Sequence, residues 1–132
     1  AFGDARPTSV STDTRALEAG ALFVALRGEN FDGHAFVDAA REKGAAAALV
    51  DRNAPGPRDI PFVTVADTTR ALGDLAAAVR AAFAGPVVGI TGSVGKTTVK
   101  EMVAALLETG FPVHRTPANH NNEIGLPQTL FA

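Results

Sequence analysis

The residues with the clearest chemical potential form one run, Thr91-Gly92-Ser93-Val94-Gly95-Lys96-Thr97-Thr98. Its glycines let the backbone turn tightly, so that several N–H groups can converge on one anion. Lys96 can reach the β- and γ-phosphates of a nucleotide as a point charge. The hydroxyl of Thr97 can be placed on Mg²⁺. The run therefore predicts a loop that binds the phosphates of ATP.

The flanking sequence supports a phosphate loop despite one departure from the general pattern, which has glycine where this chain has Ile90. An apolar run at residues 87–90 predicts a strand before the loop, and a helix is expected after it. That helix has apolar residues at helical spacing: Val99, Met102, Val103, Leu106 and Leu107. Its positive end would point at the bound phosphates. The alternative is a glycine-rich turn with a surface lysine.

A second polar segment, Asn119-His120-Asn121-Asn122-Glu123, precedes Ile124-Gly125-Leu126-Pro127. Asparagine side chains both donate and accept hydrogen bonds, which suits a neutral, hydroxyl-rich ligand such as a sugar. Glu123 could act as a metal ligand, a base or a solvated acid. The alternative is the first turn of a helix that Asn122 caps, with the rest solvated.

The elements that must position these residues alternate between strand and helix. Strands are expected at residues 21–26, 45–50 and 62–65. A helix is expected over residues 34–43 with Asp32 as its cap, and a longer helix begins after Asp67. The longer helix has an apolar face: Leu72, Leu75, Ala76, Val79 and Phe83. This alternation predicts an α/β architecture.

Gly85-Pro86 marks the expected boundary between two domains, residues 1–84 and residues 85–132. The second part should contain the strand at 87–90, the helix after the phosphate loop, and a further strand at 113–116. It is too short for a complete phosphate-loop domain, which needs more than about 100 residues. We therefore expect the start of a larger parallel α/β domain here.

Composition narrows the class of protein. The chain has 132 residues, of which 46% are hydrophobic and 20% charged, an ordinary globular balance. The net charge of −2 shows no basic footprint for nucleic acid. The absence of cysteine excludes disulfides, zinc–thiolate sites and thiol catalysis. No apolar run approaches the roughly 20 residues that span a bilayer, so we expect a cytoplasmic protein without membrane insertion.

Taken together, the two motifs resemble the Mur ligase family, whose phosphate loop carries the same variation and accounts for Ile90. Ser11-Thr12-Asp13-Thr14-Arg15 is similar to the family's Asp-Ser-Arg segment, with Thr14 in place of serine. The runs at residues 20–28 and 31–34 continue the resemblance. Lys100-Glu101-Met102 and residues 121–127 are similar to the members that add D-alanyl-D-alanine.

This resemblance implies a three-domain ligase of which the chain holds a small amino-terminal α/β domain and the start of the central phosphate-loop domain. It implies that ATP and Mg²⁺ support ligation of D-alanyl-D-alanine to UDP-N-acetylmuramoyl-tripeptide through an acyl phosphate. Lys96 would be catalytic, Thr97 would hold the metal, and Gly92 to Thr98 would bind ATP. The substrate-binding residues implied are Thr12, Thr14, Asn30 and Phe31 near the uridine diphosphate, and Asn121 and Asn122 near the muramoyl part.

By the same resemblance we expect the complete protein to be a monomer and the chain alone to be inactive. Three alternatives remain open on the sequence. The first is another ligase of the superfamily, either one that adds a single amino acid or one similar to folylpolyglutamate synthase. The second is a phosphate-loop binding module without ligase chemistry. The third is a fragment that only binds a nucleotide sugar.

Overall fold

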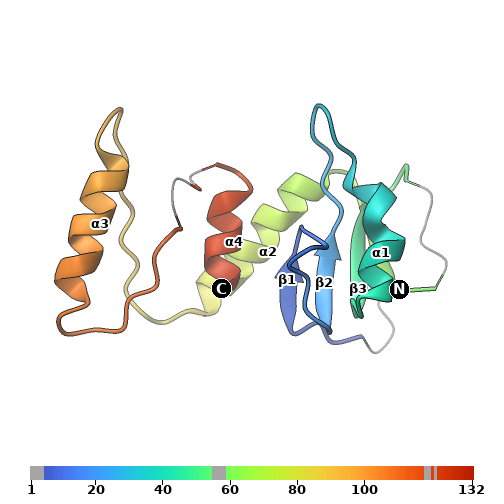
Figure 1. Cartoon of the computed structure of the whole chain (residues 1–132), viewed down its shortest axis with the longest axis horizontal. Helices are drawn as coiled ribbons and strands as arrows, with labels where there is room; N and C mark the ends of the chain where they lie inside the picture. The colour runs from blue at the N-terminus through green and yellow to red at the C-terminus, as the bar shows by residue number, and fades with distance from the viewer. Residues whose placement is uncertain (1–4, 55–58, 118–119, 121) are drawn as a thin grey trace.

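The computed structural model describes residues 5–54, 59–117, 120 and 122–132. It is an α/β fold, as expected, with one parallel sheet and helices on both of its faces (Figure 1). Along the chain the elements are β1 (Ser9–Ser11), β2 (Ala21–Val24), the 3-10 helix η1 (Gly33–Phe36), α1 (Val37–Glu42), β3 (Ala47–Asp51), β4 (Phe62–Val65), α2 (Thr68–Ala82), α3 (Lys96–Leu107) and α4 (Gly125–Phe131).

The four-stranded sheet has the order β1-β2-β3-β4, and every neighbouring pair is parallel. The three expected strands are confirmed as β2, β3 and β4; β4 has the expected bounds, and the ends of β2 and β3 differ by at most two residues. β2 and most of β3 are buried, which explains their continuous apolar sequence. β1 was not expected, because three half-buried residues of mixed polarity leave no strand pattern.

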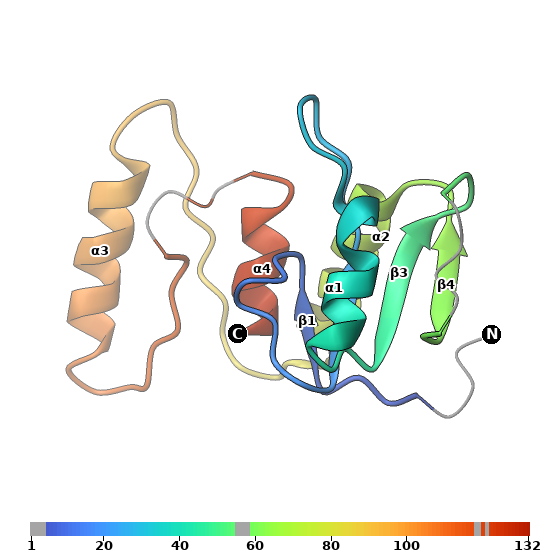
Figure 2. The ribbon, with the colours of Figure 1, turned by 45° about the vertical axis from the view of Figure 1, so that its right-hand side comes forward.

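The two faces of the sheet pack against different helices (Figure 2). On one face, Phe23 and Val50 contact Val37 and Ala40 of α1. On the other face, the core joins β2 and β3 to α2 and α4, and its members include Leu22, Val24, Leu49 and Leu72, with Ile124 and Phe131 packed against them. Both faces are therefore covered, as an all-parallel sheet requires.

The expected caps determine where the helices begin. Asp67 accepts hydrogen bonds from the backbone N–H groups of Thr69 at 2.9 Å and Arg70 at 3.0 Å, which confirms its role as the N-cap of α2. Asp32 accepts from the N–H of His34, but the helix it caps is only the short η1. α1 starts separately at Val37, so the single helix expected over residues 34–43 is two helical segments.

The apolar face expected for α2 is only partly buried. Leu72 and Ala76 are buried and Leu75 packs against the core, but Val79 and Phe83 are 43% and 54% exposed. The last turns of α2 extend past the sheet, so an apolar residue there finds less of the core to contact (Figure 1). The same pattern therefore predicts the helix correctly and overestimates its burial.

The strands expected at residues 87–90 and 113–116 are wrong for this structure, since neither segment is part of a strand. A strand needs a neighbour to complete its hydrogen-bond ladder. Among the described residues the sheet contains only β1 to β4, and neither segment joins it. Val87 and Val88 are consequently 50% and 61% exposed.

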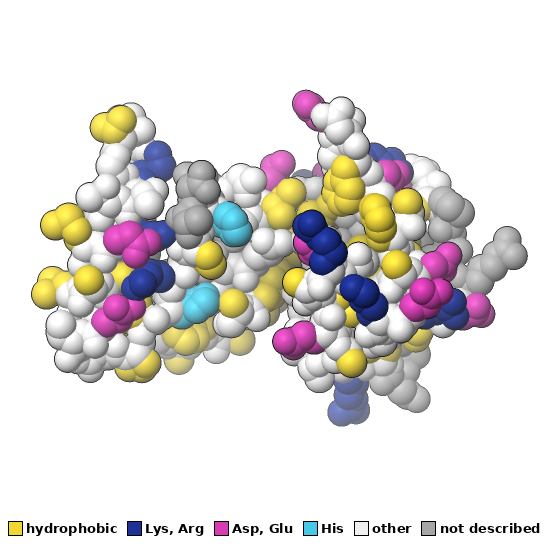
Figure 3. Space-filling view, in the orientation of Figure 1, with side chains coloured by type: hydrophobic (Ala, Val, Ile, Leu, Met, Phe, Trp, Pro, Cys, Tyr) yellow, Lys and Arg dark blue, Asp and Glu magenta, His cyan; other side chains and the backbone are white. Residues whose placement is uncertain are grey.

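The helices α3 and α4, both after residue 85, differ in how much of the fold they contact. α4 packs against α2 and β1, and both ribbon views place α4 between α3 and the sheet. α3 lies at the outer end of the molecule, where Val99, Met102 and Leu106 are exposed, and hydrophobic side chains are visible along this end in Figure 3.

The expected division of the chain into two domains between residues 84 and 85 stays a prediction. No helix in the described part of the chain is long and apolar enough to cross a membrane.

Candidate functional site

The phosphate loop leads directly into α3, as the sequence predicts. Gly92 and Gly95 have φ values of 151° and 78°, backbone conformations that residues with a Cβ rarely adopt. The loop from Thr91 to Gly95 is exposed. The Nζ atom of Lys96 donates a hydrogen bond to the carbonyl oxygen of Gly92 at 2.6 Å, so the lysine folds back over the loop.

The residues of this loop fit the group they are expected to bind. The first N–H groups of α3 have no acceptor within the helix, and the positive end of the helix faces the loop. Thr97 and Thr98 are exposed in the first turn, and a hydroxyl is an oxygen ligand of the kind that Mg²⁺ takes. The described residues contain no cluster of three histidine or acidic groups that could hold a metal without the nucleotide. Thr97 as an oxygen ligand of Mg²⁺ therefore stays a prediction.

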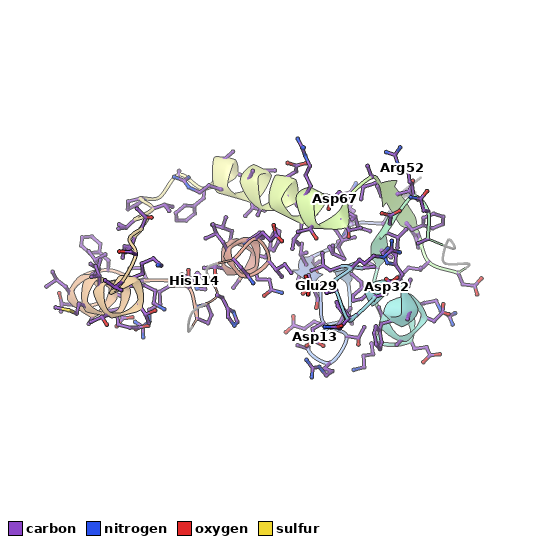
Figure 4. The ribbon with its side chains drawn as sticks, turned by 90° about the horizontal axis from the view of Figure 1, so that it is seen from above. Asp13, Glu29, Asp32, Arg52, Asp67 and His114 are labelled. Carbon is purple, nitrogen blue, oxygen red and sulfur yellow. The ribbon has the colours of Figure 1, made fainter. Side chains whose placement is uncertain are left out.

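Four of the other expected site residues follow strands at the carboxyl edge of the sheet, where open α/β sheets bind ligands. Figure 4 looks down on this edge, around which the labelled Asp13, Asp32, Arg52 and Asp67 lie. Thr12 and Thr14 follow β1, and Asn30 and Phe31 follow β2. Parallel strands therefore bring two segments that are distant in sequence to one edge.

The turn after β1 is held by an ion pair. Asp13 accepts hydrogen bonds from the backbone N–H of Arg15 at 2.8 Å and from its guanidinium, with the closest contact at 2.6 Å. The side-chain hydrogen bond from Arg15, followed by the backbone one, lowers the pKa of Asp13 to about 2. The carbonyl oxygen of Thr14 accepts from Lys43 Nζ at 2.7 Å. The turn is thus stabilised by the Asp13–Arg15 contacts around Thr14 and by the hydrogen bond from Lys43 to the Thr14 carbonyl.

The segment after β2 forms a small hairpin, residues 27–32, that the sequence predicts only as a loop. Arg27 and Asp32 form an antiparallel bridge at its base, and the N–H of Gly28 donates to the carbonyl of Phe31 at 2.8 Å. Asn30 and Phe31 are exposed at its far end. At the base, Gly33 N–H donates to the Leu26 carbonyl at 2.7 Å, an approach that a Cβ on Gly33 would block.

An open groove of about 810 Å³ runs between α2 and α4 and reaches the base of this hairpin. Arg27 and Asn122 both line it, although they are far apart in sequence. Its charged lining residues are Arg27, Arg70, Arg80, Asp67 and Glu123. The expected site residue Asn122 thus lines a groove together with three arginines that the sequence did not single out, because nothing in their local pattern shows that they face one groove.

Asn122 has a structural role that the sequence left as an alternative. Its Oδ1 atom accepts hydrogen bonds from the N–H groups of Gly125 at 2.7 Å and Ile124 at 3.3 Å, which caps the start of α4. The residue also lines the groove, so capping and ligand contact are compatible at this position. Asn121, the other asparagine expected at the site, lies outside the described residues.

The structure does not bring all expected site residues together. Thr12 is half-buried and its hydroxyl accepts a hydrogen bond from Gln128 Nε2 at 2.6 Å. Lys96 and its loop lie with α3, on the far side of α4 from the sheet (Figures 1 and 2). The edge with Thr12, Thr14, Asn30 and Phe31 and the phosphate loop are thus separate parts of the described structure.

Comparison with known proteins defines the class. The chain belongs to the Mur ligase family, because the family model described as "Mur ligase family, catalytic domain" matches residues 6–119. Within that family the chain is 49% identical, over 128 residues, to the UDP-N-acetylmuramoyl-tripeptide–D-alanyl-D-alanine ligase of Synechocystis sp.. The match covers 96% of this chain and 28% of that relative.

Solved structures of ligases agree with the fold. A UDP-N-acetylmuramoylalanyl-D-glutamyl-2,6-diaminopimelate–D-alanyl-D-alanyl ligase from Acinetobacter baumannii aligns with a TM-score of 0.85 and 41% identity over 95% of this chain and 28% of its own. The MurF ligase from Thermotoga maritima in complex with ADP aligns with a TM-score of 0.82 and 37% identity, covering 96% of this chain and 29% of its own. The chain thus spans less than a third of each of these relatives.

Proposed function

We propose that the complete protein ligates D-alanyl-D-alanine to UDP-N-acetylmuramoyl-tripeptide at the expense of ATP, a cytoplasmic step in making peptidoglycan precursors. The observation that carries this proposal is the 49% identity, over 96% of the chain, to a relative with that name. The glycine-rich loop before α3 and the groove that Asn122 lines support the proposal, since such a reaction needs one site for ATP and one for the nucleotide sugar.

The proposed reaction forms an amide in two transfers. A carboxylate oxygen of the tripeptide attacks the γ-phosphorus of ATP, the bond to ADP breaks, and an acyl phosphate forms. The amine of D-alanyl-D-alanine then attacks the acyl carbon, loses a proton, and displaces inorganic phosphate. Charge builds up on the transferring phosphoryl group, so positioned cations and N–H donors accelerate the first transfer.

Each expected site residue has a role in this proposal. Lys96 leaves its bond to the Gly92 carbonyl and neutralises charge on the phosphoryl group. Thr97 would hold Mg²⁺, and the ion would supply further charge neutralisation. The backbone of residues 92–98 binds the phosphates of ATP. ADP in the complex of the Thermotoga maritima relative supports nucleotide binding by this family.

The nucleotide-sugar substrate is proposed to bind at the carboxyl edge of the sheet and in the groove. Thr12, Thr14, Asn30 and Phe31 contact the uridine diphosphate, and Asn122, together with Asn121, faces the muramoyl part. Arg27, which the sequence did not predict as a site residue, adds a cation to the groove that Asn122 also lines. Guanidinium groups suit phosphate and carboxylate partners, both of which this substrate carries.

A substrate screen on the complete protein tests the proposal. Phosphate release is measured with ATP, Mg²⁺ and three acceptors, each offered with its own nucleotide precursor: D-alanyl-D-alanine with UDP-N-acetylmuramoyl-tripeptide, a diamino acid with UDP-N-acetylmuramoyl-L-alanyl-D-glutamate, and D-glutamate with UDP-N-acetylmuramoyl-L-alanine. We expect turnover with the dipeptide alone. Turnover with a single amino acid would assign the protein to another reaction of the family, and ATP hydrolysis that ignores all three acceptors would favour a nucleotide-binding module.

A further inference from the structure

The imidazole of His34 is buried between the hairpin after β2 and the end of β3, with 7% of its side chain exposed. The backbone N–H of Asp51 donates a hydrogen bond to Nε2 at 2.9 Å, so Nε2 carries no proton. The proton of the neutral ring therefore sits on Nδ1, which donates to Asp32 Oδ1 at 2.5 Å. The two partners together fix both the tautomer and the orientation of the ring.

The carboxylate of Asp32 connects this ring to Arg27. It accepts from the backbone N–H of His34 at 3.0 Å on one side. On the other, Oδ2 accepts from Arg27 Nε at 3.2 Å and pairs with Nη2 at 3.1 Å. Hydrogen bonds from the backbone and ring of His34, with a smaller contribution from Arg27, hold the pKa of Asp32 at about 2. Asp32 thus keeps a negative charge facing the guanidinium.

We propose that Asp32 and His34 form a positioning pair that holds Arg27 at the groove for an anionic group of the nucleotide-sugar substrate. This inference rests on the proposed function. The Arg27 side chain is 53% exposed, so without a partner it would sample many rotamers. A partner whose own orientation is fixed by a buried ring reduces that freedom before the ligand arrives, and preorganisation of this kind increases affinity.

The arrangement explains why the ring is buried rather than exposed. An aspartate alone could pair with Arg27, but an exposed ion pair gains little and leaves both side chains mobile. His34 adds a bond from Asp32 to the backbone of β3, a central strand of the sheet. The same hydrogen bonds hold the base of the hairpin that carries Asn30 and Phe31, because Asp32 lies at that base. Asp32 and His34 act through Arg27 and do not themselves touch the ligand.

The test compares His34→Ala and His34→Asn in the complete protein, with and without Arg27→Ala, by calorimetric binding of UDP-N-acetylmuramoyl-tripeptide. The asparagine amide can still donate to Asp32, whereas alanine cannot. We expect His34→Ala to weaken binding about tenfold and His34→Asn to retain most of the affinity. In the Arg27→Ala background, His34→Ala should cause less than about a twofold further loss, because the two residues act as one unit. An equal loss in both backgrounds would overturn the proposal.

A second measurement does not depend on the ligand or on the folding of the His34 variants. The Nε–H resonance of Arg27, identified by its absence in Arg27→Ala, should exchange slowly with water in the wild type and rapidly in Asp32→Asn. Slow exchange in both would overturn the positioning role. Asp32 is half-exposed, so this variant is expected to fold, and thermal unfolding checks it.

Two further outcomes separate this inference from the proposed function. Loss of affinity for UDP alone in Arg27→Ala identifies the diphosphate as the anion, whereas loss only with the tripeptide ligand identifies its carboxylates. If the wild-type protein binds neither ligand, the proposed function and the ligand assigned to Arg27 are both wrong. A slow Nε–H resonance that depends on Asp32 would in that case still show the pair holding Arg27.

Discussion

Gln128 on α4 and Thr12 after β1 are joined by a 2.6 Å hydrogen bond from the glutamine Nε2 to the threonine hydroxyl, across 116 positions of sequence. Phe131 of the same helix and Ile124 just before it pack against the core cluster that β2, β3 and α2 form. His114 Nε2 lies 2.9 Å from the carbonyl oxygen of Thr129 and connects α4 to the segment after α3. α4 is therefore the element that links the sheet edge to the phosphate-loop part of the chain.

Removing the Gln128 side chain should loosen α4. In Gln128→Ala, the bond to Thr12 is lost and the half-buried hydroxyl has one partner fewer, at a cost of about 1 kcal/mol. Hydrogen exchange of residues 125–131 should accelerate about fivefold, while that of β2 stays unchanged. Thr12→Ser keeps the hydroxyl and serves as the matched control. Equal exchange in the wild type and Gln128→Ala would show that the apolar contacts alone dock the helix.

Lys96 is the residue with the largest expected effect on activity. Lys96→Ala in the complete protein should reduce ATP-dependent ligation by at least about a hundredfold, because a charge contact to the transferring phosphoryl group is lost. Among the described residues, the Lys96 side chain bonds only the exposed carbonyl of Gly92, so the melting temperature of Lys96→Ala should equal that of the wild type. Arg41→Ala, far from the loop, controls for loss of a cation. Turnover like that of the wild type would contradict the assignment.

The two roles of Asn122 can be separated by substitution. Asn122→Ala removes the acceptor for the Gly125 and Ile124 N–H groups and should cost about 1 kcal/mol of stability. Asn122→Asp keeps that acceptor and should melt like the wild type. In the proposed site the added negative charge would nevertheless weaken binding of the anionic nucleotide sugar. If calorimetry shows unchanged affinity of Asn122→Asp for the nucleotide sugar, Asn122 caps α4 and does not contact the substrate.

The Asp13–Arg15 pair predicts an acid dependence of stability. The pKa of Asp13 is about 2 in the folded protein, below its ordinary value of 3.8. The pair therefore contributes fully above pH 3.8, and its contribution is lost as the pH falls from there toward 2. In Arg15→Ala the carboxyl resonance of Asp13 should titrate closer to 3.8, and acid unfolding should depend less on pH in this range. Arg52→Ala is the control, and a titration near pH 2 in Arg15→Ala would contradict the cause.

Hydrogen exchange along the 132-residue chain should divide it into a protected and an unprotected part. β2 is buried on both faces of the sheet, whereas Val99, Met102 and Leu106 on α3 are 46%, 67% and 72% exposed. Amides of residues 96–107 should therefore exchange much faster than those of residues 21–24, or the chain should self-associate through this face. Equal protection in a dilute monomer would show that the second part is stable by itself.

Where short-range patterns decide the structure, they could be read from the sequence. Asp67 caps α2 because its side chain reaches N–H groups two and three residues ahead. The glycine-rich turn that leads into α3 is recognisable because its glycines and the helix that follows are adjacent in the chain, while its binding of phosphate stays a prediction. β2 and β3 are evident because strands buried on both faces need continuous apolar sequence.

Tertiary structure decided the features that depend on partners distant in sequence. Residues 87–90 have a strand's composition, yet they form no strand without a neighbour to pair with. Arg27 lines the groove from a hairpin in which Asp32 bonds both Arg27 and the buried ring of His34, and that ring accepts a hydrogen bond from the N–H of Asp51. Asn122 and Arg27 line one groove because α4 packs on α2. Such contacts leave no periodic signal, since each one joins segments whose spacing the chain alone does not specify.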